Sequence, residues 1–194
     1  MPEKSDMKKD ILNAAIKEFA EKGFDQTTMA DIAKEAGIAV GSIYNYSENK
    51  VTLFENCAAH LLEEFSSFLE PSLIEEEDRI YALILRTFDY LKADLARAKI
   101  ILIESFNFMI NNPHSPIFHA IIDFEERLKG TLRDEIPESK TYNREIQLSI
   151  LLGGVERLIK ELIFFPGKSA FDKKEAAREI AAVLLAHTKC KEIN

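Results

Sequence analysis

The sparse distribution of glycine and proline is the feature that most restricts the fold of this chain. Only 7 glycines and 6 prolines occur in 194 residues. They separate long stretches in which apolar side chains recur every three or four residues, as in an amphipathic helix. No stretch alternates between apolar and polar residues in the way that a half-buried strand requires. The sequence therefore predicts an all-α protein of about nine helices.

Capping residues and prolines give the expected ends of the helices. Thr28 and Asp31 have the spacing of a capping box, and Gly23 follows the first helix where a left-handed cap is favourable. Pro116 suits the first position of a helix. The expected helices span approximately residues 6–22, 28–36, 40–46, 50–70, 72–92, 94–111, 115–136, 142–165 and 172–190. Because three helices precede a long connecting one, we expect one domain at residues 1–50 and a second at residues 51–194.

The composition is that of a folded but acidic protein. Hydrophobic residues make up 46% of the chain and charged residues 30%, and the formal net charge is −8. Disordered chains have few apolar residues and a high net charge, so this balance argues against disorder. The negative charge also argues against a broad, non-specific nucleic-acid binder, since phosphate contacts need lysine or arginine. Any such contact must come from a small patch whose carboxylates point elsewhere.

No segment has the features of a targeting or membrane-spanning sequence. The apolar runs are shorter than the roughly 20 residues needed to cross a bilayer, and no basic head precedes an apolar run at the N-terminus. Cys57 and Cys190 lie too far apart to make a disulfide framework, so we expect buried free thiols. The expected location is the cytoplasm, with no membrane partner.

Residues 27–50 have the pattern of two short helices that cross at a tight turn. Ile32, Ala33 and Ala36 are small or apolar at helical spacing, and Gly37 stands where the turn favours a positive φ. The helix after the turn presents small side chains first, then two phenols and an amide. Such a second helix suits the major groove of DNA.

Several side chains around this turn have the chemistry to hold phosphate groups. Hydroxyls and free amides at a helix N-terminus bind phosphate, and phenol and ammonium groups donate to it. The candidates are Thr27, Thr28, Tyr44, Tyr46 and Lys50. Each has a structural alternative: the threonines as caps, one tyrosine as a core residue, and Lys50 as a solvated surface lysine.

A longer set of positions, within residues 8–54, carries a family resemblance. These positions are Ile11-Leu12-Asn13-Ala14-Ala15, Phe19, Gly23-Phe24, Thr27-Thr28, Asp31-Ile32-Ala33, Ala36-Gly37, Gly41-Ser42-Ile43-Tyr44 and Lys50. Together they resemble, without gaps, the N-terminal domain of the TetR family of transcriptional regulators. The rest of the chain is similar to the family only in the number and order of its helices.

The resemblance implies a role for each matching position. The residues that would hold the DNA backbone are Thr27, Thr28, Tyr44, Tyr46 and Lys50. The residues that would face bases or adjacent phosphates are Val40, Ser42 and Asn45, while Gly41 would let the helix approach the groove closely. The chain departs from the family at Ser47, where an aromatic residue usually packs the recognition helix against the next helix.

The resemblance also implies a C-terminal body that binds a ligand. The expected apolar walls are Phe88, Ile103, Phe106, Ile110, Phe118, Ile121 and Phe124. The polar groups Tyr90, Glu104, Asn107 and His119 interrupt these stretches and would orient the ligand, unless they lie on solvated faces. Thirteen phenylalanines and no tryptophan favour an apolar or amphipathic effector, with a fatty acyl chain as one candidate.

The last two helices are expected to form a two-fold dimer interface. The penultimate helix is apolar on more than one face, which favours burial against a partner. Two adjacent glycines would each disfavour a helix interior by roughly 1 kcal/mol, so they indicate close contact between helices. The expected interface residues are Gly153, Gly154, Leu158, Leu162, Ile180 and Leu184.

These features predict a dimeric DNA-binding regulator, and the family resemblance favours a repressor that leaves an inverted-repeat operator when its effector binds. The helix that starts near Lys50 would join the effector pocket to the expected DNA-binding domain at residues 1–50, which we call the reading head. An enzyme is disfavoured, because the four histidines lack helical metal-site spacing and no phosphate loop or nucleophile elbow occurs. We therefore expect no cofactor and no metal. The alternative is a helical adaptor protein that retains the reading head but binds no specific DNA site.

Overall fold

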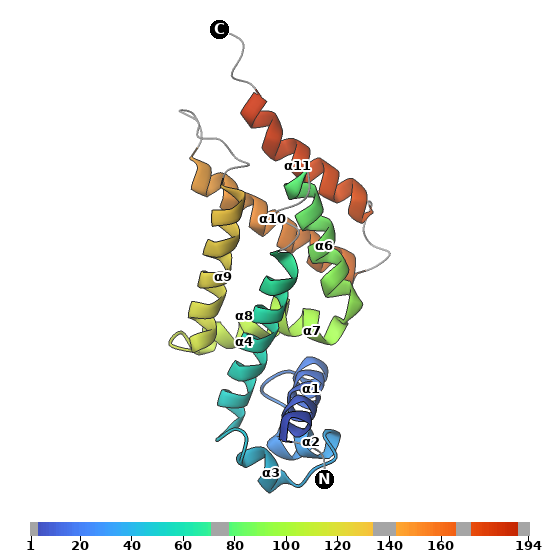
Figure 1. Cartoon of the computed structure of the whole chain (residues 1–194), viewed down its shortest axis with the longest axis vertical. Helices are drawn as coiled ribbons and strands as arrows, with labels where there is room; N and C mark the ends of the chain where they lie inside the picture. Colours follow the sequence, from blue (N-terminus) through green and yellow to red (C-terminus); the bar gives the residue numbers. More distant parts are fainter. Residues whose placement is uncertain (1–3, 71–77, 134–142, 166–171, 190–194) are drawn as a thin grey trace. The chain divides into compact units, whose positions relative to one another are not determined.

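The computed structural model describes residues 4–70, 78–133, 143–165 and 172–189, and every regular element in these ranges is helical (Figure 1). The elements are α1 (Lys4–Lys22), α2 (Met29–Glu35), α3 (Val40–Tyr44), α4 (Lys50–Leu69), α6 (Arg79–Ala93), α7 (Leu95–Lys99), the π-helical turn η1 (Ile100–Glu104), α8 (Ser105–Asn111), α9 (Pro116–Leu132), α10 (Arg144–Phe164) and α11 (Lys173–Lys189). If α7, η1 and α8 are taken as one interrupted helix, the described ranges hold nine helices. The all-α fold class is therefore confirmed.

The helix ends follow the signals expected from the sequence. Gly23 adopts φ +80° and its N–H donates to Phe19 O at 2.9 Å, which closes α1 with a left-handed cap. Thr28 and Asp31 form a reciprocal capping box at the start of α2. α9 begins at Pro116, as predicted. The expected ends at residues 71–72, 137, 142, 166–167 and 190 lie outside the described residues.

The helix expected as one piece over residues 94–111 is interrupted, which corrects the prediction. Asp94 caps its start, because its side chain accepts from the N–H groups of Ala96 and Arg97. The backbone then widens into η1, where the N–H of Ser105 donates to Ile100 O, five residues earlier. An apolar run such as Ile-Ile-Leu-Ile carries the same spacing in either helix type, so periodicity did not reveal this turn.

The chain forms two compact units. Unit 1 holds residues 1–64 and 94–121, and unit 2 holds residues 65–93 and 122–194. This division groups segments by contact and is not a single boundary along the chain. The expected boundary between residues 50 and 51 therefore remains a prediction.

The core of unit 1 is an aromatic and aliphatic cluster that joins α1, α4 and α8. Phe19 and Phe54 are fully buried, with ring centroids 5.0 Å apart. Phe108 lies 4.8 Å from both Phe24 and Phe54. Cys57 is a buried free thiol, as expected, and burial raises the pKa of this thiol to about 12. Cys190 lies outside the described residues.

Unit 2 is built from the end of α4, α6, the end of α9, α10 and α11. Phe65 stacks on Tyr90 at 5.0 Å and on Phe124 at 5.4 Å, which joins α4, α6 and α9. α6 packs against α10 and α11, and Lys173 at the start of α11 pairs with Asp89 of α6. Within the described residues no helix is both long and apolar enough to cross a membrane.

Candidate nucleic-acid interface

The turn between α2 and α3 fixes the geometry of the candidate interface. Gly37 adopts φ +68°, a left-handed conformation that disfavours side chains, although a Cβ atom there would meet nothing within 4 Å. Ile32 and Ile43 are completely buried, one from each helix. Both side chains belong to the buried cluster that also contains the apolar residues of α1, while the glycine provides the bend.

The opposite face of α3 is open to solvent. Val40 is 40% exposed and Tyr44 is 53% exposed, while Gly41 and Asn45 are also exposed and Ser42 is half-buried. A Cβ atom on Gly41 would meet nothing within 4 Å, and its φ is not positive. The fold itself therefore gives no reason for a glycine at this position, which is consistent with close approach by a partner.

The two threonines before α2 have different environments. Thr27 is 1% exposed, and its hydroxyl lies 2.8 Å from Gly23 O and 3.1 Å from Glu18 O. That side chain fastens the loop to the end of α1 and is not available to a phosphate in this structure. Thr28 is exposed, and its Oγ1 accepts from Asp31 N at 3.1 Å. Thr28 is therefore a cap that also lies on the surface.

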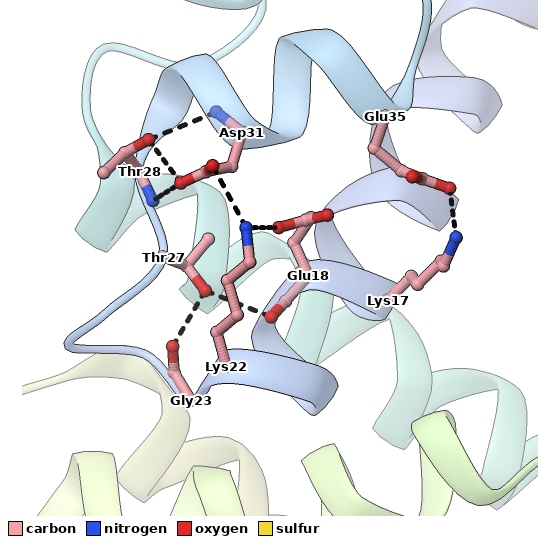
Figure 2. Close-up of polar contacts among 8 residues, drawn as sticks. All are labelled: Lys17, Glu18, Lys22, Gly23, Thr27, Thr28, Asp31 and Glu35. Atoms are coloured by element: carbon pink, nitrogen blue, oxygen red, sulfur yellow. Dashed lines mark hydrogen bonds and ion pairs between the residues drawn. The ribbon is translucent and has the colours of Figure 1, made fainter.

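Three carboxylates on α2 and the adjoining part of α1 are paired with lysines, which lowers their effect on an approaching phosphate. Figure 2 shows Lys22 between Glu18 and Asp31, at 2.6 Å and 3.0 Å respectively. Lys17 pairs with Glu35 at 2.6 Å. Hydrogen bonds from Thr28, with the nearby ammonium of Lys22, lower the pKa of Asp31 to about 2. The seven lysines and nine carboxylates of residues 1–50 are thus partly neutralised within the head.

Lys50 and Tyr46 border the candidate interface where α4 begins. Lys50 Nζ donates to Phe24 O at 2.8 Å and Asp25 O at 3.1 Å, and lies 4.5 Å from the centre of the Phe24 ring. An ammonium group has three N–H donors, and these two contacts use two of them. Tyr46 is half-buried, and burial raises its pKa. Lys50 is thus a link between α4 and the loop after α1, and not a freely solvated lysine.

Ser47, where the chain departs from the family pattern, is buried and makes local hydrogen bonds. It is 3% exposed, its N–H donates to Ile43 O at 2.8 Å, and its hydroxyl donates to Asn49 O at 3.2 Å. Asn49 Oδ1 in turn accepts from Thr52 N at 2.9 Å and caps α4. Hydrogen bonds at Ser47 thus hold α3 against the start of α4 where the family usually has ring packing.

The expected effector residues are divided between the two units. Unit 1 holds Ile103, Glu104, Phe106, Asn107, Ile110, Phe118, His119 and Ile121, and unit 2 holds Phe88, Tyr90 and Phe124. In unit 1, Phe106 and Ile110 are more than half exposed, whereas the Glu104 side chain is only 12% exposed. In unit 2, Phe88 is buried and Tyr90 and Phe124 flank Phe65. A common pocket for these residues remains a prediction.

The expected dimer residues lie on the last two helices of unit 2. Gly153 and Gly154 are exposed with nothing within 4 Å of a Cβ, while Leu158, Leu162 and Ile180 are half-buried. The side chain of Leu184 lies outside the described residues. The expected interface residues did not include Ile146 and Ile150 on α10, which are 60% and 65% exposed. Their four-residue spacing, continued by Gly153 and Gly154, was the available signal.

Two further residues that the sequence reasoning did not connect with the head contact it. Lys99 donates to Ala20 O at the end of α1, and Phe108 joins the aromatic cluster beside Phe24. No group of three or more histidine, cysteine, aspartate or glutamate residues suited to a metal is found in the described part of the chain.

Two short helices with buried apolar faces, a glycine turn between them and an exposed outer face on the second helix define a helix-turn-helix protein. Residues 11–57 match the model of the family described as bacterial regulatory proteins, tetR family. These residues therefore form an N-terminal domain of the tetR family, and the resemblance expected from residues 8–54 is confirmed.

Three known proteins illustrate the similarity. The HTH-type transcriptional regulator YhgD of Bacillus subtilis is 42% identical over 72 residues, which cover 35% of this chain and 38% of that protein. The match thus spans well under half of that relative's length. The fatty acid degradation regulator FadR of Bacillus halodurans has a similar structure, with TM-score 0.79, 20% identity and coverage of 97% and 99%. FadR of Bacillus subtilis, solved in complex with stearoyl-CoA, gives TM-score 0.71, 19% identity and coverage of 92% and 97%.

Proposed function

We propose that this chain is a sequence-specific DNA-binding transcriptional regulator, most simply a dimeric repressor that an effector releases from an inverted-repeat operator. The exposed face of α3 carries this proposal. Ile43 anchors the helix while Val40, Gly41, Tyr44 and Asn45 face solvent. A rigidly held helix with a small residue in its first turn fits the major groove.

The roles at the interface follow from exposure and donor chemistry. Val40, Ser42 and Asn45 read bases or contact adjacent phosphates, and Gly41 allows close approach. Tyr44 is an exposed donor for the DNA backbone, and Tyr46 borders it. Thr28 is also exposed, and its hydroxyl would exchange its hydrogen bond to Asp31 for one to a phosphate. Thr27 and Lys50 support the interface from inside, by fixing the loop after α1 through Gly23 O and Phe24 O.

The proposed effector is apolar or amphipathic, and a fatty acyl thioester is the specific candidate. Support comes from the aromatic residues of α6, α8 and α9 and from the fold shared with a regulator solved with stearoyl-CoA. Phe65, Tyr90 and Phe124 supply an aromatic surface in unit 2 that suits hydrocarbon. Titration with stearoyl-CoA and with coenzyme A alone distinguishes recognition of the acyl chain from recognition of the nucleotide.

The proposed dimer uses one face of α10 together with α11. Ile146 and Ile150 are largely exposed and stand one turn apart, followed by Gly153 and Gly154 on the same face. Such a stripe buries its apolar surface only against a partner, and the glycines allow close contact. A two-fold dimer presents two α3 helices to the two halves of an operator. A DNA target implies a cytoplasmic location.

Selection of binding sites from a random duplex library, at near-physiological salt, tests the proposed function. An enriched inverted repeat supports a dimeric, sequence-specific regulator. One observation favours the adaptor function instead: Thr27 and Lys50, both expected to hold phosphates, direct their polar groups to backbone carbonyls. Weak, salt-sensitive binding without enrichment would support that alternative.

A further inference from the structure

The π turn η1 changes which side chains of its helix are neighbours. In an α-helix each residue advances by about 100°, so positions five apart lie about 140° apart around the axis. In η1 the backbone bond from Ser105 N to Ile100 O spans five residues, which brings such positions together. Lys99 and Glu104, five residues apart, are side by side, with Nζ and Oε1 3.9 Å apart.

This pair meets the C-terminal end of α1. Lys99 Nζ donates to Ala20 O, and Glu104 Oε2 lies 3.7 Å from the position that a Cβ would take on Gly23. The C-terminal end of a helix carries partial negative charge, which favours the ammonium and disfavours the carboxylate. Glu104 is therefore tolerated there because Lys99 lies beside it.

The end of α1 leads directly into the candidate interface. Gly23 O accepts the hydroxyl of Thr27, and Phe24 O accepts from Lys50. The rings of Phe24 and Phe108 are 4.8 Å apart, so α8 packs on the same loop. A change in the register of η1 would therefore shift the residues that orient α2 and α3.

The π register leaves one buried hydroxyl without a partner. Ser105 is 1% exposed, and its Oγ has no hydrogen-bond partner among the described residues. A serine in a regular α-helix can donate to the carbonyl four residues earlier. The unsatisfied hydroxyl therefore reduces the free-energy difference that favours the π register over an α register. An element that changes between two states requires such a reduced difference.

We propose that η1 is a regulatory joint, in which Lys99 and Glu104 are positioning residues that hold the end of α1 and hence the reading head. Conversion to an α register separates the two side chains and releases Ala20 O from Lys99. The inference rests on the proposed function, since the output of the joint is DNA affinity. Any ligand that rearranges the residues after Glu104 would act through it.

Point variants test the positioning role by the affinity for the selected operator. Lys99→Met lowers the affinity by about tenfold, within the usual range of coupling between sites. It also speeds amide exchange at residues 20–24, and its melting temperature stays close to that of the wild type. Lys99→Arg retains the affinity. Glu104→Gln added to Lys99→Met restores part of it, because the unpaired carboxylate is removed. Lys129→Met, which breaks the ion pair with Glu126 in α9, is the matched control.

A pair of single-residue deletions tests the register. Deletion of Leu102 removes the extra residue of the π turn and leaves Lys99 and Glu104 four apart in a plain α-helix, still neighbours. This variant folds and binds the operator like the wild type, but responds at least about tenfold less to stearoyl-CoA. Deletion of Asn107, in the α-helical turn of α8, rotates Phe108 out of its cluster and lowers the melting temperature far more.

Three results would overturn the joint. These are unchanged affinity and exchange in Lys99→Met, equal destabilisation by the two deletions, and a full effector response without Leu102. If the wild-type protein selects no operator, the proposed function fails separately. The amide exchange at residues 20–24 and the stabilities of the two deletion variants then test whether η1 is a regulatory joint. If stearoyl-CoA has no effect on the wild type, the proposed class of effector is wrong. The amide exchange, the stabilities of the deletion variants and the operator affinity of Lys99→Met then test whether η1 is a regulatory joint.

Discussion

The reading head and α10 differ in how far their apolar side chains are buried. In the head, Ile32 and Ile43 are completely buried within unit 1. In α10, Ile146 and Ile150 are more than half exposed in unit 2. Exposed apolar stripes of this kind mark interaction surfaces more often than solvated faces. Unit 1 thus buries these residues of the head within itself, whereas α10 leaves apolar side chains exposed in unit 2, which the proposed dimer would cover.

Removing an aromatic side chain from unit 1 should have the largest effect. Phe54 is fully buried and lies within 5.2 Å of the rings of Phe19, Phe24 and Phe108. Phe54→Ala should lower the free energy of unfolding by about 3–5 kcal/mol, as for other large-to-small core changes. Urea denaturation measures this loss. A loss below about 1 kcal/mol would mean that the cluster is not the core.

A charge on the exposed face of α10 should affect assembly instead of folding. Ile150→Arg should give a monomer at micromolar concentration, because a dimer interface would have to bury an unpaired guanidinium. Sedimentation velocity separates the two states, and Ser67→Arg, an exposed position on α4, is the control. A dimer that survives Ile150→Arg would remove α10 from the proposed interface.

Two glycines of the head should respond in opposite directions to the same substitution. Gly37→Ala forces a side chain into φ +68° and should destabilise the protein by about 1–2 kcal/mol. Gly41→Ala fills open space within α3 and should stabilise the free protein by up to about 1 kcal/mol, while weakening operator binding. Thermal denaturation and operator titration of both variants check this. Equal losses of stability would contradict the open space at Gly41.

The capping box should show a small, defined pH dependence. The pKa of Asp31 falls from 3.8 to about 2 on folding, so its contribution is fully present above pH 4 and is lost as the pH falls through about 2. Asp31→Asn should therefore reduce stability at pH 7, and its difference from the wild type should shrink between pH 4 and pH 2. A difference that is constant over this range would show that Asp31 is not the titrating cap.

The parts of the fold that could be predicted are those set by local chemistry. The caps at Gly23 and Thr28 and the start at Pro116 depend on backbone preferences of a few neighbouring residues. The π turn could not be foreseen, because its apolar sequence suits an α-helix equally well. It occurs where Lys99 and Phe108 contact α1 and its following loop, which are distant in sequence.

The candidate site was predicted in its position but not in its detailed contacts. The exposed residues of α3 follow from helical spacing around Ile43. The internal bonds of Thr27 and Lys50 do not follow, because their acceptors are backbone carbonyls fixed by the tertiary fold. The aromatic residue missing at Ser47 also gave no indication that hydrogen bonds would take its place.

The proposed function depends most directly on the reading of bases by α3. We would repeat the site selection with Asn45→Ala, since Asn45 is exposed and an amide pairs specifically with adenine. We expect an inverted repeat with relaxed preference at one base pair in each half-site and an unchanged preference elsewhere. An identical preference at every position, with wild-type affinity, would contradict base reading by Asn45 and weaken the case for α3 as the recognition helix.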